Sequence, residues 1–344
     1  MAEFVTYRLH FRAPLHIGER GVGLEATRTH VPADTLFSAL CMAWRTLYGV
    51  EALEQDVLDW FTEAEAGSEP FLLSSAFPYA GEVRLFPKPL ARLGHLEAED
   101  EKAFKRVRWV SERVFAALVS GEALRFEKKH CLNGGTVWVS EVEKAALAPW
   151  TDDATEDIVL WKEAVVPRVT LDRLTQASEI WHFGEVRFAP GVGLWFAVDF
   201  NQDHGDGLRQ RFEACLRLLG DSGLGGERGA GRGLFELEPV REEPLPEAEA
   251  ASHFVTLSPL CPRREELAIL LAEGAAYELM PRRGWVTSPE AANLRRQMVW
   301  MFAEGSLFPR PEGMRLGRLV SVKPERCPHA VWRYGYAFPV GVKK

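Results

Sequence analysis

The stretch LRLLGDSGLGGERGAGRGLFEL, residues 216–237, carries the clearest fold signal in the chain. Apolar residues at helical spacing predict a helix over 207–219 that ends at Gly220, and a strand is predicted at 234–237. A dinucleotide-binding fingerprint needs the opposite order, a strand followed by glycines and then a helix. No Gly-Lys-Ser/Thr closes the run either, so a P-loop is also excluded.

The turn inside this stretch combines freedom of the backbone with positive charge. Five glycines fall between positions 225 and 233, together with two arginines. Such a loop lets its amides and guanidinium groups approach a phosphate backbone closely. A flexible surface loop is the alternative interpretation. The candidate RNA contacts here are Gly225, Gly226, Arg228, Gly229, Gly231 and Arg232.

Toward the N-terminus, residues 4–12 alternate apolar and polar, which predicts a half-buried strand with a basic second face. Asp34 is expected to cap a helix that ends at Gly49. Further strands are predicted at 71–77, 135–140, 180–188 and 194–200. This order fits an α+β fold, a strand–helix–strand–strand–helix–strand unit of ferredoxin-like type with an inserted hairpin region.

The pattern restarts after residues 241–251, which are rich in Pro and Glu and are predicted to form a linker. A strand from 252, a helix at 265–272, a helix near 290–303 and strands near 316–322 and 329–338 predict a second α+β domain. We therefore expect domains at 1–240 and 252–344.

The net charge of -8 argues at first against a nucleic-acid partner. The acidic residues are concentrated, however, in four blocks at 51–69, 97–101, 152–157 and 238–249, which together carry -19. The rest of the chain therefore carries +11. This distribution predicts a local, not a general, affinity for RNA.

Motifs of catalysis and metal binding are missing from the sequence. It has no C-x-x-C, H-E-x-x-H or G-x-S-x-G, and its five cysteines lie far apart, as in a protein of the reducing cytoplasm. No apolar run is long enough to span a membrane, and the N-terminus has no secretory-signal pattern. No cofactor and no metal are expected. His10, His16 and His30 leave a metal-free ribonuclease as an alternative function.

Other basic residues lie beside glycines or aromatic rings, a combination that suits single-stranded nucleic acid. Arg282-Arg283-Gly284-Trp285 and Trp332-Arg333-Tyr334-Gly335-Tyr336 are examples, although aromatic residues at strand spacing are more often part of a core. In these two segments the candidate RNA contacts are Arg282, Arg283 and Arg333.

Several blocks of the sequence, in order, resemble the RAMP superfamily, and more closely the fourth Csm subunit of type III-A CRISPR effector complexes. The resemblance covers most of the chain, Thr6 to Val342. It is carried by HIGERGVGLEATRTHVPADTLFSALCMAW, LSSAFPY, VPRVTLDRLT, the glycine-rich stretch, LRRQMVWMFAEGS and HAVWRYGYAFPVGV. One departure is Gly229-Ala230 with Arg232, where many members have small hydroxyl residues.

This resemblance implies two ferredoxin-like (RRM-like) domains with an inserted β-hairpin thumb. It implies a non-catalytic, cytoplasmic subunit that binds the 5′ repeat-derived tag of the CRISPR RNA in antiviral defence. The tag contacts that it implies are the residues of the glycine-rich turn, His16, Gly18, Arg20 and Gly21 after the first strand, and Arg168 and Arg173 in the insertion. Its partners would be the large polymerase-palm subunit and the backbone RAMP subunit. The runner-up is a CRISPR RNA-processing endoribonuclease of the same superfamily, and a third possibility is a protein-interaction subunit without RNA contact.

Overall fold

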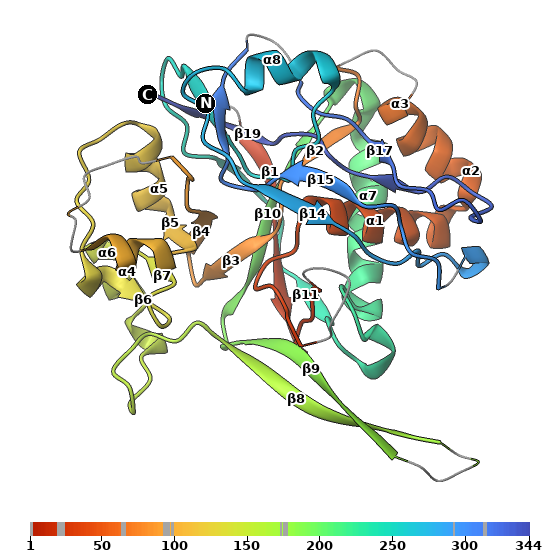
Figure 1. The fold of residues 1–344 in the computed structure, drawn as a ribbon, viewed down its shortest axis with the longest axis horizontal. Coiled ribbons are helices and arrows are strands. Elements are labelled where there is room, and N and C mark those ends of the chain that lie inside the picture. Colours follow the sequence, from red (N-terminus) through yellow and green to blue (C-terminus); the bar gives the residue numbers. More distant parts are fainter. Residues whose placement is uncertain are drawn as a thin grey trace.

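The computed structural model of the chain describes residues 3–18, 25–62, 67–91, 97, 100–172, 174, 178–291, 293–311 and 315–344. It is a mixed α+β fold built around one large sheet, from which a long hairpin projects (Figure 1). The strands of the large sheet follow the order β11-β1-β10-β3-β4-β5-β7-β6, with β12 beside β1 and β2 beside β10. The neighbouring strands are antiparallel except for β5 and β7, which are parallel.

The strands of the large sheet are β1 (Glu3–Phe11), β2 (Phe71–Leu73), β3 (Phe77–Ala80), β4 (Val83–Pro87), β5 (Trp109–Ser111), β6 (Cys131–Leu132), β7 (Val137–Trp138), β10 (Val192–Phe200), β11 (Phe235–Leu237) and β12 (Arg241–Pro244). The smaller sheets contain β8 (Trp161–Leu171) with β9 (Ser178–Phe188), β13 (His253–Thr256) with β16 (Leu307–Pro309) and β19 (Pro339–Val342), β14 (Leu279–Arg282) with β15 (Val299–Phe302), and β17 (Val320–Ser321) with β18 (Trp332–Arg333).

The helices are α1 (Ala33–Tyr48), α2 (Val50–Leu53), α3 (Asp59–Thr62), α4 (Glu101–Arg106), α5 (Glu112–Val119), α6 (Glu141–Ala146), α7 (Gly205–Ser222) and α8 (Leu267–Leu270). A π-helical turn, Glu54–Leu58, joins α2 to α3. Short 3₁₀ turns include Arg228–Ala230 in the glycine-rich loop and Pro289–Ala291.

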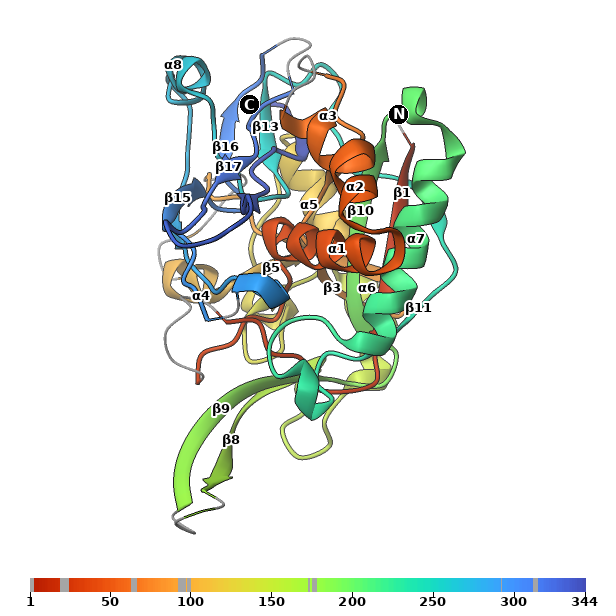
Figure 2. The ribbon, with the colours of Figure 1, turned by 90° about the vertical axis from the view of Figure 1, so that its right-hand side faces the viewer.

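The N-terminal strands and helices are arranged as the sequence predicts. Strands β1, β10 and β11 and helices α1 and α7 are confirmed, and β1 lies between β10 and β11. Helices α1 and α7 cross and contact each other on one side of the sheet (Figure 2). Tyr7 of β1 and Phe212 of α7 are in ring contact at 5.7 Å, which shows how the apolar face of the first strand is covered.

The hairpin expected in the inserted region is present as β8 and β9, paired from Trp161 opposite Phe188 to Leu171 opposite Ser178. It extends well beyond the rest of the molecule (Figures 1 and 2). Its outer part exposes apolar side chains, Val165, Val169, Leu171, Leu174 and Ile180. We call this hairpin the thumb.

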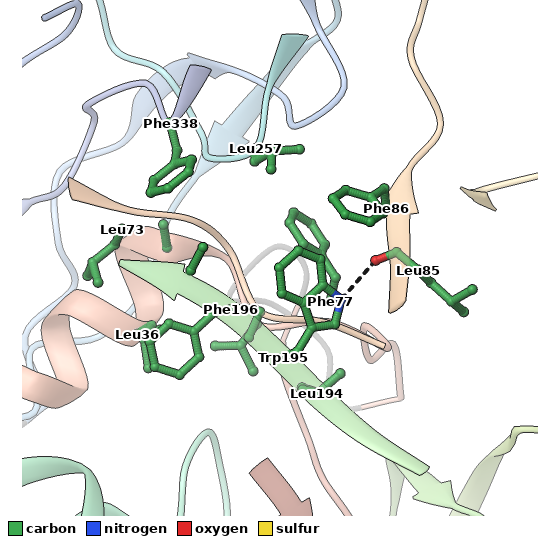
Figure 3. Packing of buried hydrophobic residues seen from close by; sticks show 14 of the residues in the cluster. Leu36, Leu73, Phe77, Leu85, Phe86, Leu194, Trp195, Phe196, Leu257 and Phe338 are labelled. Carbon is green, nitrogen blue, oxygen red and sulfur yellow. Dashed lines mark hydrogen bonds between the residues drawn. The ribbon is translucent and has the colours of Figure 1, made fainter. Parts of the chain in front are cut away.

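One hydrophobic core runs through both halves of the chain. Trp195 of β10 lies at its centre and donates from Nε1 to the Leu85 carbonyl at 3.0 Å (Figure 3). Leu257 and Phe338, from beyond residue 251, pack into the same core. The predicted division into 1–240 and 252–344 stays a prediction, and the core crosses it.

Three local predictions are wrong. Residues 241–251 are not all linker, because Arg241–Pro244 form β12 beside β1. The expected helix near 290–303 is instead a 3₁₀ turn followed by strand β15, because Val299–Phe302 pair with β14. Asp34 is not the N-cap of α1, since Pro32 occupies that position and Asp34 lies in the first turn, fully buried.

The basic second face of β1 is also less basic than the sequence suggests. Arg8 is buried, donates to the Gly81 carbonyl at 2.8 Å and pairs with Glu82 at 3.3 Å. This arginine is therefore part of the interior. Within the described residues, no helix has the length and apolar character needed to cross a membrane.

Candidate nucleic-acid interface

The first loop brings His16 against the base of the thumb. After β1, Leu15 pairs with Val186 of β9, and His16 Nδ1 donates to the Gly184 carbonyl at 2.8 Å. The imidazole also packs 4.3 Å from the ring of Phe183. Burial lowers the pKa of His16 below its ordinary value, which keeps the ring neutral and leaves Nε2 as an acceptor.

The glycine-rich loop is seated directly on this first loop. The Gly226 amide donates to the His16 carbonyl at 3.0 Å. Gly225 has φ +93°, and a Cβ there would lie 2.3 Å from the His16 carbonyl oxygen, so only glycine fits. The structure therefore joins two glycine clusters that lie about 200 residues apart in the sequence.

The two arginines of the glycine-rich loop have different environments. Arg228 is exposed, and its guanidinium group has no hydrogen bond or ion pair with any described residue, whereas its carbonyl accepts from the Gly231 amide at 2.9 Å. Arg232 instead pairs with the fully buried Glu185 of β9 at 2.7 Å, and Arg187 pairs with the same carboxylate. Arg232 therefore ties the loop to the thumb, and its contact with RNA stays a prediction.

A buried ion cluster lies beside this loop, where α1 meets the C-terminal strands. Arg282 binds Asp34 through two hydrogen bonds of 2.8 and 3.0 Å, and Arg333 pairs with the same carboxylate. Burial alone would raise the pKa of Asp34, but the two guanidinium groups outweigh it and hold that pKa well below its ordinary value. Arg282 and Arg333, predicted as RNA contacts, thus have an internal partner.

A third arginine in this cluster, Arg296, was not predicted. It donates to the Ser38 hydroxyl at 3.1 Å, and its Nε has no partner. Burial, and next the charge of Arg333, lower the pKa of Arg296 to about 10. One aspartate therefore faces three arginines, which leaves positive charge in excess. The Arg295-Arg296 pair is a weak sequence signal, and it lies in a segment wrongly predicted as helical.

These segments meet around a cavity of about 330 Å³, which we call the arginine cavity. Among the described residues, five arginines line it against a single acid, Glu227. The lining residues that the sequence predicts are His16, Gly18, Gly225, Gly226, Arg228, Arg282, Arg283 and Arg333. Trp285, also in the lining, is 44% exposed and carries Arg295 over its ring at 4.8 Å.

The other predicted residues lie elsewhere. Gly229 and Gly231 are on the open side of the loop, and Arg168 is on the thumb opposite Trp181. Arg20, Gly21 and Arg173 are outside the described residues. Base stacking on Tyr334 and Tyr336 is contradicted, because both rings are buried in the core.

The three histidines do not form one site. His16 lines the arginine cavity, whereas the partly buried His30 lies 3.5 Å from Glu304 and lines a different cavity. Burial lowers the pKa of His30 as well. Among the described residues no group of three or more His, Cys, Asp or Glu side chains is arranged to hold a metal ion.

Comparisons with known proteins agree with this architecture. Residues 249–342 match the family described as the CRISPR Csm4 C-terminal domain. The CRISPR system Cms protein Csm4 of Thermococcus onnurineus is 29% identical over 318 residues, 90% of this chain and 91% of the relative. The protein of the same name from Mycobacterium tuberculosis is 31% identical over 302 residues, 86% of this chain and 85% of the relative.

Solved structures show the same fold. A chain in the crystal structure of a Csm3–Csm4 subcomplex of the type III-A CRISPR-Cas interference complex has a TM-score of 0.70 at 17% identity, over 99% of this chain and 100% of that chain. A chain in a Csm1–Csm4 cassette in complex with cA4 has a TM-score of 0.58 at 21% identity, over 99% and 98%.

The matched family model and relatives, together with the α+β fold and the glycine-rich loop after α7, identify a RAMP-type protein of a CRISPR system. The extent of the sequence match then gives the particular family: the chain belongs to the Csm4 family.

Proposed function

We propose that this chain is a non-catalytic subunit of a type III-A CRISPR effector complex that binds the 5′ repeat-derived tag of the CRISPR RNA. The observation that carries the proposal is the arginine cavity, where both glycine clusters and five arginines meet. Phosphate contacts from arginines and backbone amides hold a single strand in place without reading its sequence.

Within the cavity, different residues have different tasks. Arg228 and Arg283 are exposed and bind phosphate oxygens, whereas Arg282 and Arg333 are held by Asp34 and shape the cavity wall. Arg296 adds a charge that Asp34 does not neutralise. The half-exposed ring of Trp285 offers a surface on which a base stacks.

The chain joins the large polymerase-palm subunit to the backbone RAMP subunit. Solved complexes that contain Csm4 with Csm1 and Csm4 with Csm3 support this part of the proposal. The exposed apolar residues of the thumb suit a protein contact in such an assembly. Two ferredoxin-like domains, 1–240 and 252–344, belong to the same proposal, and the order β11-β1-β10-β3 supports the first.

RNA–protein crosslinking of the purified complex, with the crosslinked peptides mapped by mass spectrometry, tests RNA binding directly. We expect crosslinks in 223–233 and in 283–296, the segments that line the arginine cavity. Crosslinks confined to other segments would overturn the assignment of the cavity.

The endoribonuclease alternative has its own test. Incubation of the chain with repeat RNA in the absence of metal ions should give no cleavage product, because His16 is buried and held by the Gly184 carbonyl. A product that disappears in His16→Ala would show that the chain is a nuclease.

A further inference from the structure

A second cavity, of about 370 Å³, lies beside residues 28–30. We call it the tryptophan cavity, after Trp109 in its wall. Trp109 of β5 lines it, as do Lys88, directly after β4, and Arg108, directly before β5; Arg28 and Glu278 come from other parts of the chain. None of the predicted RNA contacts that the structure describes lines this cavity.

The wall of the tryptophan cavity contains hydrogen-bond donors without partners. Trp109 is 5% exposed, and its Nε1 has no hydrogen-bond partner. The Nε of Arg28 is buried and equally without a partner. Buried donors are nearly always satisfied in folded proteins, so two in one cavity wall call for an acceptor supplied from outside.

The charges around these donors favour an anion as that acceptor. In the part of the lining that the structure describes, Arg28, Lys88, Lys105 and Arg108 face two carboxylates, Glu278 and Glu304. The Arg108 guanidinium is exposed and makes no hydrogen bond or ion pair with any described residue. A phosphate group combines the negative charge and the several acceptor oxygens that this set of donors requires.

Two elements connect this cavity with the arginine cavity. The first loop lines the arginine cavity at Gly18 and the tryptophan cavity at Arg28, and Gly18 is bridged to Thr27. Strand β14 has Arg282 at one end, in the arginine cavity, and follows Glu278, in the tryptophan cavity. Four residues of extended chain separate the two ends by about 13 Å. In Figure 1, β14 crosses the front of the molecule between α1 and β3.

We propose that the tryptophan cavity binds a second phosphate of the same RNA strand, so that the strand runs along β14 from one cavity to the other. This inference rests on the proposed function, because it extends a path that begins in the arginine cavity. A separation of about 13 Å is short enough to be bridged by a few nucleotides of single strand, within the usual site size of single-strand binders.

A series of RNAs of increasing length tests this path. The affinity of the full-length chain for single-stranded RNAs of increasing length is measured by fluorescence anisotropy at several salt concentrations. Arg108→Ala removes the free cation, and Trp109→Phe removes the Nε1–H donor while keeping an aromatic ring against Phe77. Arg264→Ala is the matched control, since Arg264 is exposed and lines neither cavity.

We expect Arg108→Ala and Trp109→Phe to bind the shortest RNAs as the wild type does. The wild type should bind RNAs that span both cavities more tightly than the shortest RNAs, and both variants should lack this gain. With the longer RNAs, Arg108→Ala should also lower the slope of log affinity against log salt by about 0.7. If neither variant differs from the wild type at any length while Arg228→Ala weakens binding, the path is wrong and the proposed function stands.

The opposite result distinguishes RNA binding at the arginine cavity from RNA binding at the tryptophan cavity. If Arg108→Ala weakens binding and Arg228→Ala does not, the assignment of the arginine cavity fails and the tryptophan cavity remains an RNA site. If both tryptophan-cavity variants bind RNA normally but lose a partner protein during purification of the complex, the cavity is a protein interface and the RNA path is overturned.

Discussion

Arg282 and Asp34, 248 residues apart in the sequence, form a two-point ion pair in the interior, with hydrogen bonds of 2.8 and 3.0 Å. Asp34 also pairs with Arg333 and is 0% exposed. This carboxylate therefore joins the first helix to the C-terminal strands. It also neutralises part of the positive charge behind the arginine cavity.

Asp34→Asn should be strongly destabilising. The asparagine keeps the shape of the side chain but leaves the buried Arg282 and Arg333 without a counter-charge, which costs about 3–5 kcal/mol for a broken buried pair. Urea unfolding measures the loss. Glu290→Gln, which breaks the exposed pair between Glu290 and Arg45, is the control and should change the free energy of unfolding little. Equal losses in both variants would contradict the role given to Asp34.

Arg296→Met should have opposite effects on stability and on RNA binding. Burial lowers the pKa of Arg296 to about 10, so the charge is unfavourable in the folded protein, and replacing it with an apolar side chain should stabilise by about 1 kcal/mol or more. The same change should weaken RNA binding. Thermal unfolding and anisotropy measure the two effects. A less stable variant with unchanged RNA affinity would show that Arg296 is purely structural.

The acid sensitivity of the fold should depend on Glu304. Burial would raise the pKa of Glu304, but His30 and Ser75 outweigh it and lower that pKa to about 2 from the ordinary value of 4.5. Because the folded pKa lies below the unfolded one, the stabilisation is complete above pH 4.5 and is lost as the pH falls toward 2. Urea unfolding across this range should show a weaker pH dependence in Glu304→Gln. If the free energy of unfolding changed with pH equally in the wild type and in Glu304→Gln, Glu304 would not be a source of the acid sensitivity.

Two glycines of the same loop should respond differently to alanine. Gly225→Ala places a Cβ 2.3 Å from the His16 carbonyl at φ +93°, so it should destabilise by more than about 1 kcal/mol and weaken RNA binding. Gly229→Ala meets no heavy atom within 4 Å and is the matched control. Urea unfolding and RNA anisotropy compare the pair. A neutral Gly225→Ala would mean that the loops are not packed as described.

The sequence predicts those parts of the fold whose signal is local. Strand β1 and helices α1 and α7 have clean periodicities, and each is found where it is expected. The segment 290–303 has apolar residues that suit a helix as well as a strand. Its pairing with β14 makes residues 299–302 a strand, and β14 lies outside the segment, so the local pattern does not contain this information.

In the candidate site too, the sequence predicts the local features but not the contacts between distant segments. The glycine-rich loop and the His16 segment are recognisable because glycine and arginine content is a local property. The partners of Arg232, Arg282 and Arg333 are not recognisable, since Glu185 and Asp34 lie far away in sequence. A basic residue beside an aromatic ring therefore predicted an open RNA surface where the structure has buried ion pairs.

The salt dependence of RNA affinity in Arg228→Ala and Arg283→Ala tests the central claim most directly. Both guanidinium groups line the arginine cavity and are exposed, so neither variant should lose stability. If each arginine binds one phosphate, each variant should bind tag RNA more weakly and lower the slope of log affinity against log salt by about 0.7. Affinities and slopes equal to those of the wild type and of Arg264→Ala would contradict RNA binding at this cavity.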